Sequence, residues 1–257
     1  MADKNTIIIG SGIGGGRNIL AALIENGYNA ILVRSMWPRD NFVYHMNKYV
    51  KGVRGLAPAS LTTNPFGEGG KILTGDDYLL ITNFAYGQNG IQLNIEKPTS
   101  YQKKEILIEA GKKHFPNSRI HVLPSSDQLG SSNSHIDMYA SLIPSKKLLL
   151  VDTRFGSQSN YNDFEEIAEK ESLKFIKFDG SQDKVWNSLN ILVLEDTVVL
   201  DNKSISLIKL LEDEGVKTIG VEMPQHSYPS GKIRCQTNVY SENSDILLDE
   251  LLGLNYF

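Results

Sequence analysis

The sequence of 257 residues contains a single cysteine, Cys235. One thiol cannot form an intramolecular disulfide or a cysteine-rich metal site, so Cys235 is either a packing residue or a nucleophile. Free cysteines behave as small hydrophobic residues and are usually buried, so packing is the better interpretation of Cys235 taken alone. The choice between the two depends on the residues that stand upstream.

Long apolar runs are absent near the N-terminus. The chain reaches only the short apolar stretch 7–9 before a group of glycines, which is too brief for a signal-peptide core or a membrane span. With one cysteine and no export signal, we expect a cytoplasmic protein with no membrane partner.

No charge of one sign is concentrated along the chain. The 26 Lys and Arg and the 30 Asp and Glu are scattered, and the formal net charge is −4. Because no basic stripe is present, we expect no nucleic-acid partner. A mildly acidic chain is compatible with a cationic substrate, although net charge is a weak argument for one. A homo-oligomer is compatible with all of these features.

No low-complexity linker or charge block divides the chain, so we expect one domain spanning residues 1–257. Short strand-like runs alternate with helical periodicity, which predicts a mixed-sheet α/β fold. The predicted strands are 6–9, 30–33, 42–44, 71–73, 78–82, 119–123, 148–151, 173–178, 191–194, 198–200, 218–221 and 233–239. The predicted helices are 17–25, 101–114, 161–171, 204–214 and 245–252.

A glycine motif follows the first predicted strand. Residues 10–15, Gly-Ser-Gly-Ile-Gly-Gly, match the G-x-G-x-x-G fingerprint of dinucleotide-binding folds. Arg34 and Ser35 stand where an NAD site would have an acidic residue, and they would suit the 2′-phosphate of NADP. Closely spaced strand pairs follow instead of further parallel β-α units, so a tight turn without a ligand is the better interpretation.

Two acidic residues precede strand-like runs in similar contexts. Asp40 follows Pro38 at the start of one run, where its carboxylate can project into a cleft. Glu68 precedes Gly69 and Gly70, whose lack of side chains lets another backbone or a ligand approach closely. In isolation, each motif is more typical of an ordinary turn.

His135 and Asp137 form a third pattern. In an extended chain, residues i and i+2 point to the same face about 6–7 Å apart, a spacing that suits two groups holding one small ligand. A metal site would need another ligand and lacks the usual paired spacing, so we predict no metal.

The motifs in chain order resemble the guanidino-group modifying enzymes of the pentein fold, which include arginine and agmatine deiminases, dimethylarginine dimethylaminohydrolases and amidinotransferases. The segments that carry the resemblance are Trp37-Pro38-Arg39-Asp40, Glu68-Gly69-Gly70, His135-Ile136-Asp137 and Gly231-Lys232-Ile233-Arg234-Cys235. The resemblance implies a pentein-like α/β propeller of five strand-helix-strand-strand modules with pseudo-fivefold symmetry. Arg234 departs from the histidine that many members have directly before the cysteine.

The resemblance also implies roles for these residues. Cys235 would attack the guanidinium carbon and form a covalent thiouronium intermediate. His135 would act as the general acid and base, and Glu68 would orient it. Asp40 and Asp137 would hold the small cationic guanidino substrate through charge-assisted hydrogen bonds. No metal and no organic cofactor is required.

Arginines are the candidates for holding the rest of the substrate. Arg39, Arg54 and Arg234 are predicted to bind substrate, and a fork-like contact from Arg54, Arg154 or Arg234 would suit an α-carboxylate. Without such a contact, a decarboxylated guanidine such as agmatine would fit better.

The leading hypothesis is a hydrolase that gives a ureido product. An amidinotransferase, which passes the amidino group to an acceptor amine, is the alternative. A non-catalytic pentein and an NADP-dependent oxidoreductase rank below both.

Overall fold

The structure is a computed structural model, and it describes residues 5–11, 14–35, 37–46, 48–51, 66–82, 99–123, 135–155, 158–183, 185–224, 233–242 and 246–252. Within these ranges, short strands alternate with helices along the chain, as the mixed α/β prediction requires. The described part contains no helix that is long and apolar enough to cross a membrane.

The strands of the described residues form five small sheets. In spatial order, the first contains β14 (Thr237–Ser241), β1 (Asn5–Gly10) and β2 (Asn29–Val33). The second pairs β3 (Phe42–His45) with β4 (Lys48–Lys51), and the third contains β5 (Ile72–Thr74), β6 (Tyr78–Thr82) and β7 (Arg119–Leu123). The fourth contains β10 (Lys174–Phe178), β9 (Leu148–Asp152) and β8 (Ala140–Ile143), and the fifth β11 (Leu192–Leu194), β12 (Thr197–Asp201) and β13 (Lys217–Val221).

The four three-stranded sheets share one pattern. An antiparallel pair comes first, and a helix then crosses over to a third strand parallel to the second. Parallel neighbours need such a crossover because a tight turn cannot join them. The crossover helices are α1 (Gly16–Glu25), α2 (Ser100–His114), α3 (Gln158–Lys170) and α4 (Ile205–Asp213). The first unit is completed by β14 from the far end of the chain.

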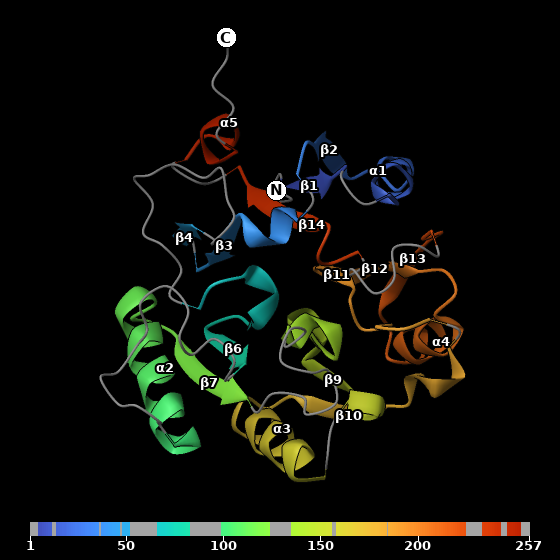
Figure 1. The fold of residues 1–257 in the computed structure, drawn as a ribbon. Helices are drawn as coiled ribbons and strands as arrows, with labels where there is room; N and C mark the ends of the chain where they lie inside the picture. Colours follow the sequence, from blue (N-terminus) through green and yellow to red (C-terminus); the bar gives the residue numbers. More distant parts are fainter. Residues whose placement is uncertain are drawn as a thin grey trace.

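Figure 1 shows the sheets around a common centre, with the four crossover helices at the periphery and the short α5 (Leu248–Leu251) beside β14. Strands near this centre are buried on both faces, so they read as continuous apolar runs; all five residues of β6 are buried, for example. Each crossover helix buries only one stripe; α1 does so through Ile19 and Leu23. The repeated unit is therefore observed, whereas the closed propeller with pseudo-fivefold symmetry stays a prediction.

Local signals explain several element ends. Thr99 caps α2, because its hydroxyl accepts from the backbone N–H of Gln102 while the Gln102 side chain accepts from the backbone N–H of Thr99. At the end of the glycine motif, Gly15 has φ 83°, and a Cβ on Gly16, the first residue of α1, would lie 2.3 Å from the carbonyl oxygen of Gly10. Because this sheet continues with the antiparallel β14, the glycines serve a close strand-to-helix turn within a three-stranded unit.

Two expectations about local conformation are wrong at the site positions: the extended chain assumed for His135 to Asp137, and the start of the strand predicted at 233–239. Residues 136–138 form a short 3-10 helix, η4 (Ile136–Met138), with His135 directly before it. Residues 233–236 form a turn, and the strand predicted to begin at 233 begins at Thr237. Strands β4 and β8 were not predicted.

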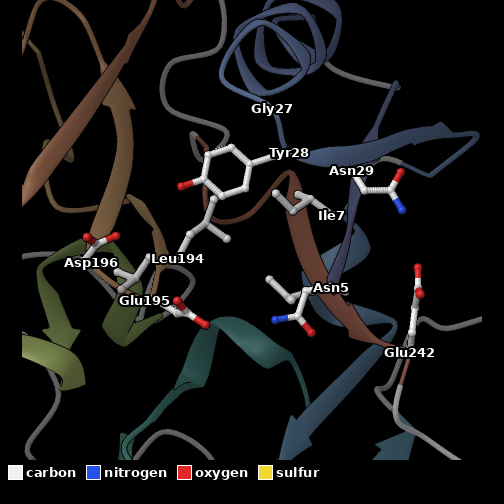
Figure 2. Close-up of a pocket in the computed structure, with 11 residues that line it drawn as sticks. Asn5, Ile7, Gly27, Tyr28, Asn29, Leu194, Glu195, Asp196 and Glu242 are labelled. Atoms are coloured by element: carbon white, nitrogen blue, oxygen red, sulfur yellow. The ribbon is translucent and has the colours of Figure 1, made fainter. Parts of the chain in front are cut away.

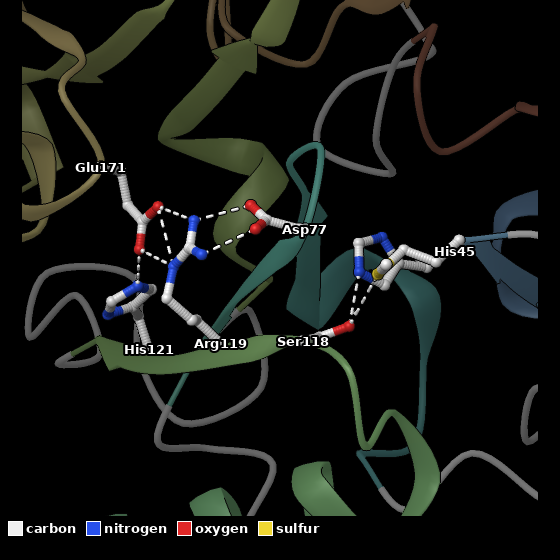
Figure 3. A network of polar contacts seen from close by, with 7 residues as sticks. His45, Asp77, Ser118, Arg119, His121 and Glu171 are labelled. Carbon is white, nitrogen blue, oxygen red and sulfur yellow. Dashed lines mark hydrogen bonds and ion pairs between the residues drawn. The ribbon is translucent and has the colours of Figure 1, made fainter.

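A polar network joins the third sheet to the end of α3 (Figure 3). Arg119 on β7 forms a bidentate contact with Asp77, at 2.6 and 2.7 Å, and donates to Glu171 at 2.7 Å. Glu171 also contacts the Nε2 atom of His121 at 2.5 Å, and its side chain is only 2% exposed. The carboxylate of Glu171 thus connects two neighbouring units of the fold.

Candidate active site

The predicted site residues occupy equivalent places in the fold. Asp40 lies in η1 (Pro38–Asp40) before β3, and Glu68 precedes η2 (Gly69–Lys71) before β5. His135 and Asp137 lie at η4 before β8, and Cys235 lies in the turn before β14. In every case the turn directly precedes the first strand of a sheet unit, so the topology carries residues far apart in sequence to one centre.

Cys235 is buried, with 7% of its surface exposed. Its Sγ atom lies 3.8 and 3.9 Å from the two carboxylate oxygens of Asp137, and it accepts a hydrogen bond from Nδ2 of Asn190 at 3.1 Å. Burial raises the pKa of the Cys235 thiol well above its usual range, and the negative charge of Asp137 raises it further, against the lowering effect of Asn190. Without a ligand the thiol is therefore protonated at neutral pH.

Asp137 is completely buried. Burial raises the pKa of its carboxyl group, although the positive charges of His135, Arg234 and Arg39 act in the opposite direction. A buried carboxylate beside a thiol is unfavourable unless a cation compensates it. His135, Arg234 and Arg39 compensate this charge in part, and a cationic ligand beside Asp137 would compensate it further.

His135 is held by Glu68, whose Oε2 atom lies 2.7 Å from Nε2 of the imidazole. Gly70 provides the room for this arrangement, because a Cβ at that position would lie 2.3 Å from Nδ1 of His135. Burial lowers the pKa of His135, but the Glu68 hydrogen bond and the charges of Asp137 and Asp40 raise it, and the net direction is upward. Glu68 thus fixes the orientation of the imidazole and favours its protonated form.

Asp40 is 5% exposed and lies near enough to Cys235 and His135 to act on both through its charge. Its negative charge raises the pKa of Cys235 and of His135, so it contributes to the field that both groups experience. Asn238 fixes the η1 turn by donating to the carbonyls of Pro38 and Phe42, each at 2.9 Å. The carboxylate of Asp40 is therefore presented by a rigid turn.

The predicted arginines have different surroundings. Arg39 is buried and donates from Nη2 to the carbonyl of Ile72 at 2.7 Å. Arg39 and Arg234 both line a cavity of about 210 Å³. Arg154 forms a bidentate contact with Asp152, at 2.6 Å for the shortest pair, so its guanidinium is already engaged. Arg54 lies outside the described residues.

Three groups could hold a metal ion. The ligand atoms of His135, Asp137 and Cys235 lie within 4.8 Å of one another. Imidazole, carboxylate and thiolate are ligands that zinc accepts. The same closeness also suits a nucleophile, a proton carrier and a substrate-holding carboxylate.

Sequence reasoning missed Asn190. It lies in the turn before β11, the place that the other site residues occupy in their units. Besides contacting the sulfur, its Oδ1 atom accepts from the backbone N–H of Cys235 at 3.3 Å, and Nδ2 donates to the carbonyl of Asp137 at 3.0 Å. Its place before a predicted strand was the available signal, but asparagine is common in turns.

A larger cavity lies elsewhere in the described part of the chain. Its volume is about 650 Å³, and Tyr28, Glu195 and Asp196 are among its lining residues (Figure 2). None of the predicted site residues lines it. Size alone does not mark the candidate active site here.

Comparisons with known proteins identify solved structures that have a similar fold. No family model and no curated protein matches the chain. An amidinotransferase, SxtG from Microseira wollei, superposes with a TM-score of 0.63 at 15% identity, covering 91% of this chain and 93% of its own. The N-terminal domain of ArgZ, an arginine dihydrolase of cyanobacteria, gives 0.62 at 14% identity, covering 92% and 97%.

A third similar structure is dimethylarginine dimethylaminohydrolase from Pseudomonas aeruginosa, with a TM-score of 0.60 at 12% identity over 93% of this chain and 100% of its own. At such low identity the likeness establishes the fold and leaves the reaction open. The chain therefore shares its fold with the guanidino-group modifying enzymes of the pentein superfamily, as its short motifs indicated.

Proposed function

We propose that this protein is a cysteine-dependent hydrolase that acts on the guanidino group of arginine, agmatine or a related compound. The observation that supports it best is the closeness of Cys235, His135 and Asp137, whose reactive atoms all lie within 4.8 Å of one another. Asp137 and Cys235 are 98 positions apart in the sequence, which makes their meeting at one centre informative.

Substrate binding would satisfy the charges of the site. A guanidinium is planar and cationic, and its N–H groups suit bidentate contacts with carboxylates such as Asp40 and Asp137. The same cation would place positive charge beside Cys235 and lower the pKa of a thiol that burial and Asp137 hold high. The nucleophile would thus form when the substrate is present.

The reaction then follows from the positions of the groups. Once the thiol has released its proton to solvent, the Cys235 thiolate attacks the guanidinium carbon; a C–S bond forms and the C=N double bond becomes a single bond. His135 donates a proton to the departing nitrogen, the C–N bond breaks, and ammonia or an amine leaves. His135 next takes a proton from water, whose oxygen bonds to the same carbon. The C–S bond breaks, the thiolate returns, the hydroxyl proton passes to ammonia or solvent, and the product carries a ureido group.

Several other features belong to the same proposal. The whole chain would act as one catalytic domain of five modules around a pseudo-fivefold axis, which the five sheets support. The substrate would be a small cation, and the chemistry would need no metal and no organic cofactor. A reduced catalytic thiol suits a cytoplasmic setting.

The test is an assay with arginine, agmatine and methylated arginines, followed by detection of the ureido product and of ammonia. We expect turnover that both Cys235→Ala and His135→Gln abolish. His114→Gln is the matched control, since His114 lies at the end of α2 and should keep full activity. Unchanged turnover in Cys235→Ala would refute the mechanism. A product that forms only when glycine, ornithine or another amine is added would assign the protein to amidino transfer.

A further inference from the structure

The cavity of about 210 Å³ beside Arg39 and Arg234 lies where units of the fold meet. Its lining residues come from four of the five sheets: Tyr44 from β3, Thr74 from β5, Leu192 and Val193 from β11, and Val239 from β14. None of the catalytic candidates Cys235, His135, Glu68, Asp40 and Asp137 is among the described residues that line it. It is therefore a space distinct from the set of catalytic groups.

The cavity carries positive charge without a matching carboxylate. No acidic residue is among the described residues that line it, and neither guanidinium has a carboxylate within ion-pair distance in the described part of the chain. The Nε atoms of both Arg39 and Arg234 are buried without a hydrogen-bond partner there. Arg39 is only 8% exposed, so water does not readily replace that partner.

The two guanidinium groups also act on each other. Burial lowers the pKa of Arg234 to about 9, and the positive charge of Arg39 is the next cause. Asp137 acts on both arginines through space, but its carboxylate lies beside Cys235, where the proposed substrate would use it. A cationic substrate beside Asp137 would thus neutralise the negative charge that now compensates the two arginines. An anion in the cavity would restore that balance.

The remaining lining identifies the kind of anion. Leu192, Val193 and Val239 add apolar side chains to the lining. A guanidinium presents parallel N–H donors that match a carboxylate in a bidentate contact. One water takes up about 30 Å³ in the liquid, so the volume of the cavity is larger than that of a few waters. It is smaller than the roughly 300 Å³ at which pockets for drug-sized ligands begin.

We propose that this cavity binds a short-chain carboxylate between Arg39 and Arg234. The carboxylate group contacts the guanidinium N–H donors, and the short alkyl group packs against the valine and leucine side chains. Val193 and Val239 also border the larger cavity that Glu195 and Asp196 line (Figure 2), so the two spaces adjoin. The acidic side chains of that neighbour make it unsuitable for the same ligand, which confines the anion to the arginine side.

The test follows chloride binding to the full chain by the linewidth of the ³⁵Cl NMR signal, with acetate and propionate as competitors. We expect a saturable excess linewidth that both carboxylates remove. In Arg234→Gln the affinity should fall about tenfold, since charge-assisted hydrogen bonds are lost. Arg34→Gln removes the same charge from an exposed position and should bind like the unaltered protein.

Three outcomes would overturn the proposal: no saturable linewidth, equal affinity in Arg234→Gln, or chloride binding that acetate does not displace, including the case in which L-arginine displaces it and acetate does not. That case would assign both arginines to the carboxylate of the guanidino substrate, and the Cys235→Ala variant allows it to be measured without turnover. If circular dichroism shows that Arg234→Gln is unfolded, crystals of the unaltered protein soaked in bromide decide the matter. An anomalous peak between the two guanidinium groups that acetate removes is expected, and its absence refutes the site.

Discussion

Asn190 contacts both the sulfur and the backbone N–H of Cys235, and replacing it with aspartate tests how these contacts control the reactivity of the thiol. The change keeps the size of the side chain and keeps an oxygen that can accept from the backbone N–H of Cys235, a contact of 3.3 Å. It replaces the Nδ2 donor, which lies 3.1 Å from the sulfur, with a second oxygen. Asn190→Asp therefore removes a hydrogen bond that favours the thiolate and adds a carboxylate next to Asp137.

Both consequences act in the same direction. A hydrogen bond to a charged group contributes about 1.5–3 kcal/mol, which corresponds to roughly 10- to 150-fold in the fraction of thiolate and hence in its rate of reaction. Two unit charges about 4 Å apart repel by about 4 kcal/mol at an effective dielectric constant of 20. The new carboxylate can relieve this repulsion by taking up a proton, so the hydrogen-bond figure sets the expected minimum. We expect Cys235 to react at least about tenfold more slowly in Asn190→Asp.

The assay is alkylation by iodoacetamide at fixed mildly alkaline pH, followed by mass spectrometry of the intact chain. Because Cys235 is the only cysteine, the adduct reports one residue. Asn202→Asp is the matched control: it makes the same exchange at an exposed position before α4 and should leave the rate unchanged. Circular dichroism establishes that both variants are folded. A folded Asn190→Asp protein whose rate stays within about twofold of the original would refute the reasoning, since the loss of one charged hydrogen bond alone predicts more.

Three further changes test other contacts of the structure. Gly70→Ala should displace the imidazole of His135, because the alanine Cβ would lie 2.3 Å from Nδ1. We expect kcat to fall at least about tenfold with little loss of stability. A steady-state assay measures kcat, and thermal unfolding measures the stability. Glu68→Gln should lower the pKa of His135, measured by NMR titration, because the hydrogen bond that raises this pKa is weakened. The fall of activity at alkaline pH should then move to lower pH. If that fall does not move, deprotonation of His135 is not its cause. Glu171→Gln should cost about 1–3 kcal/mol in urea unfolding at pH 7 and less near pH 4. Burial opposes ionisation of Glu171, but Arg119 and the histidine lower its folded-state pKa, so its contribution is present above the unfolded pKa and is lost as pH falls.

The candidate site residues that the structure brings together could be selected from the sequence because each lies in a short local pattern. An acidic residue beside glycines, as at Glu68, indicates a turn without any knowledge of the rest of the fold. Strands buried on both faces, such as β6, were predicted for the same reason, since a short apolar run bounded by turn signals needs little context.

The local conformation around His135 could not be predicted correctly. The alternation of polar and apolar residues from His135 to Asp137 is also typical of a strand, and the turn is formed by two backbone bonds instead: Met138 N–H to His135 at 3.2 Å and Tyr139 N–H to Ile136 at 3.1 Å. The predicted spacing along an extended chain was therefore wrong. The two side chains still meet at one ligand-sized space because the 3-10 turn shortens the path between them.

Asn190 escaped prediction for a different physical reason. Its value arises from contacts with Cys235 and with the carbonyl of Asp137, which lie 45 and 53 positions away in the sequence. No pattern of neighbouring residues encodes these contacts. They exist because every sheet unit places the turn before its first strand near the centre of the fold, and the residue in that turn then meets residues from other units.

The charges at that centre are the reason why we propose a cationic substrate and a Cys235 thiolate that forms only when the substrate binds. Asp137 is fully buried, and burial raises its own pKa while its charge raises that of Cys235. Protonation of the thiol is the least costly state of the site without a ligand. A guanidinium between the carboxylates reverses this balance, because it compensates Asp137 and stabilises the thiolate, so that the thiol gives up its proton more readily. An uncharged amide offers no such compensation, so the buried carboxylate discriminates against it before any bond is broken.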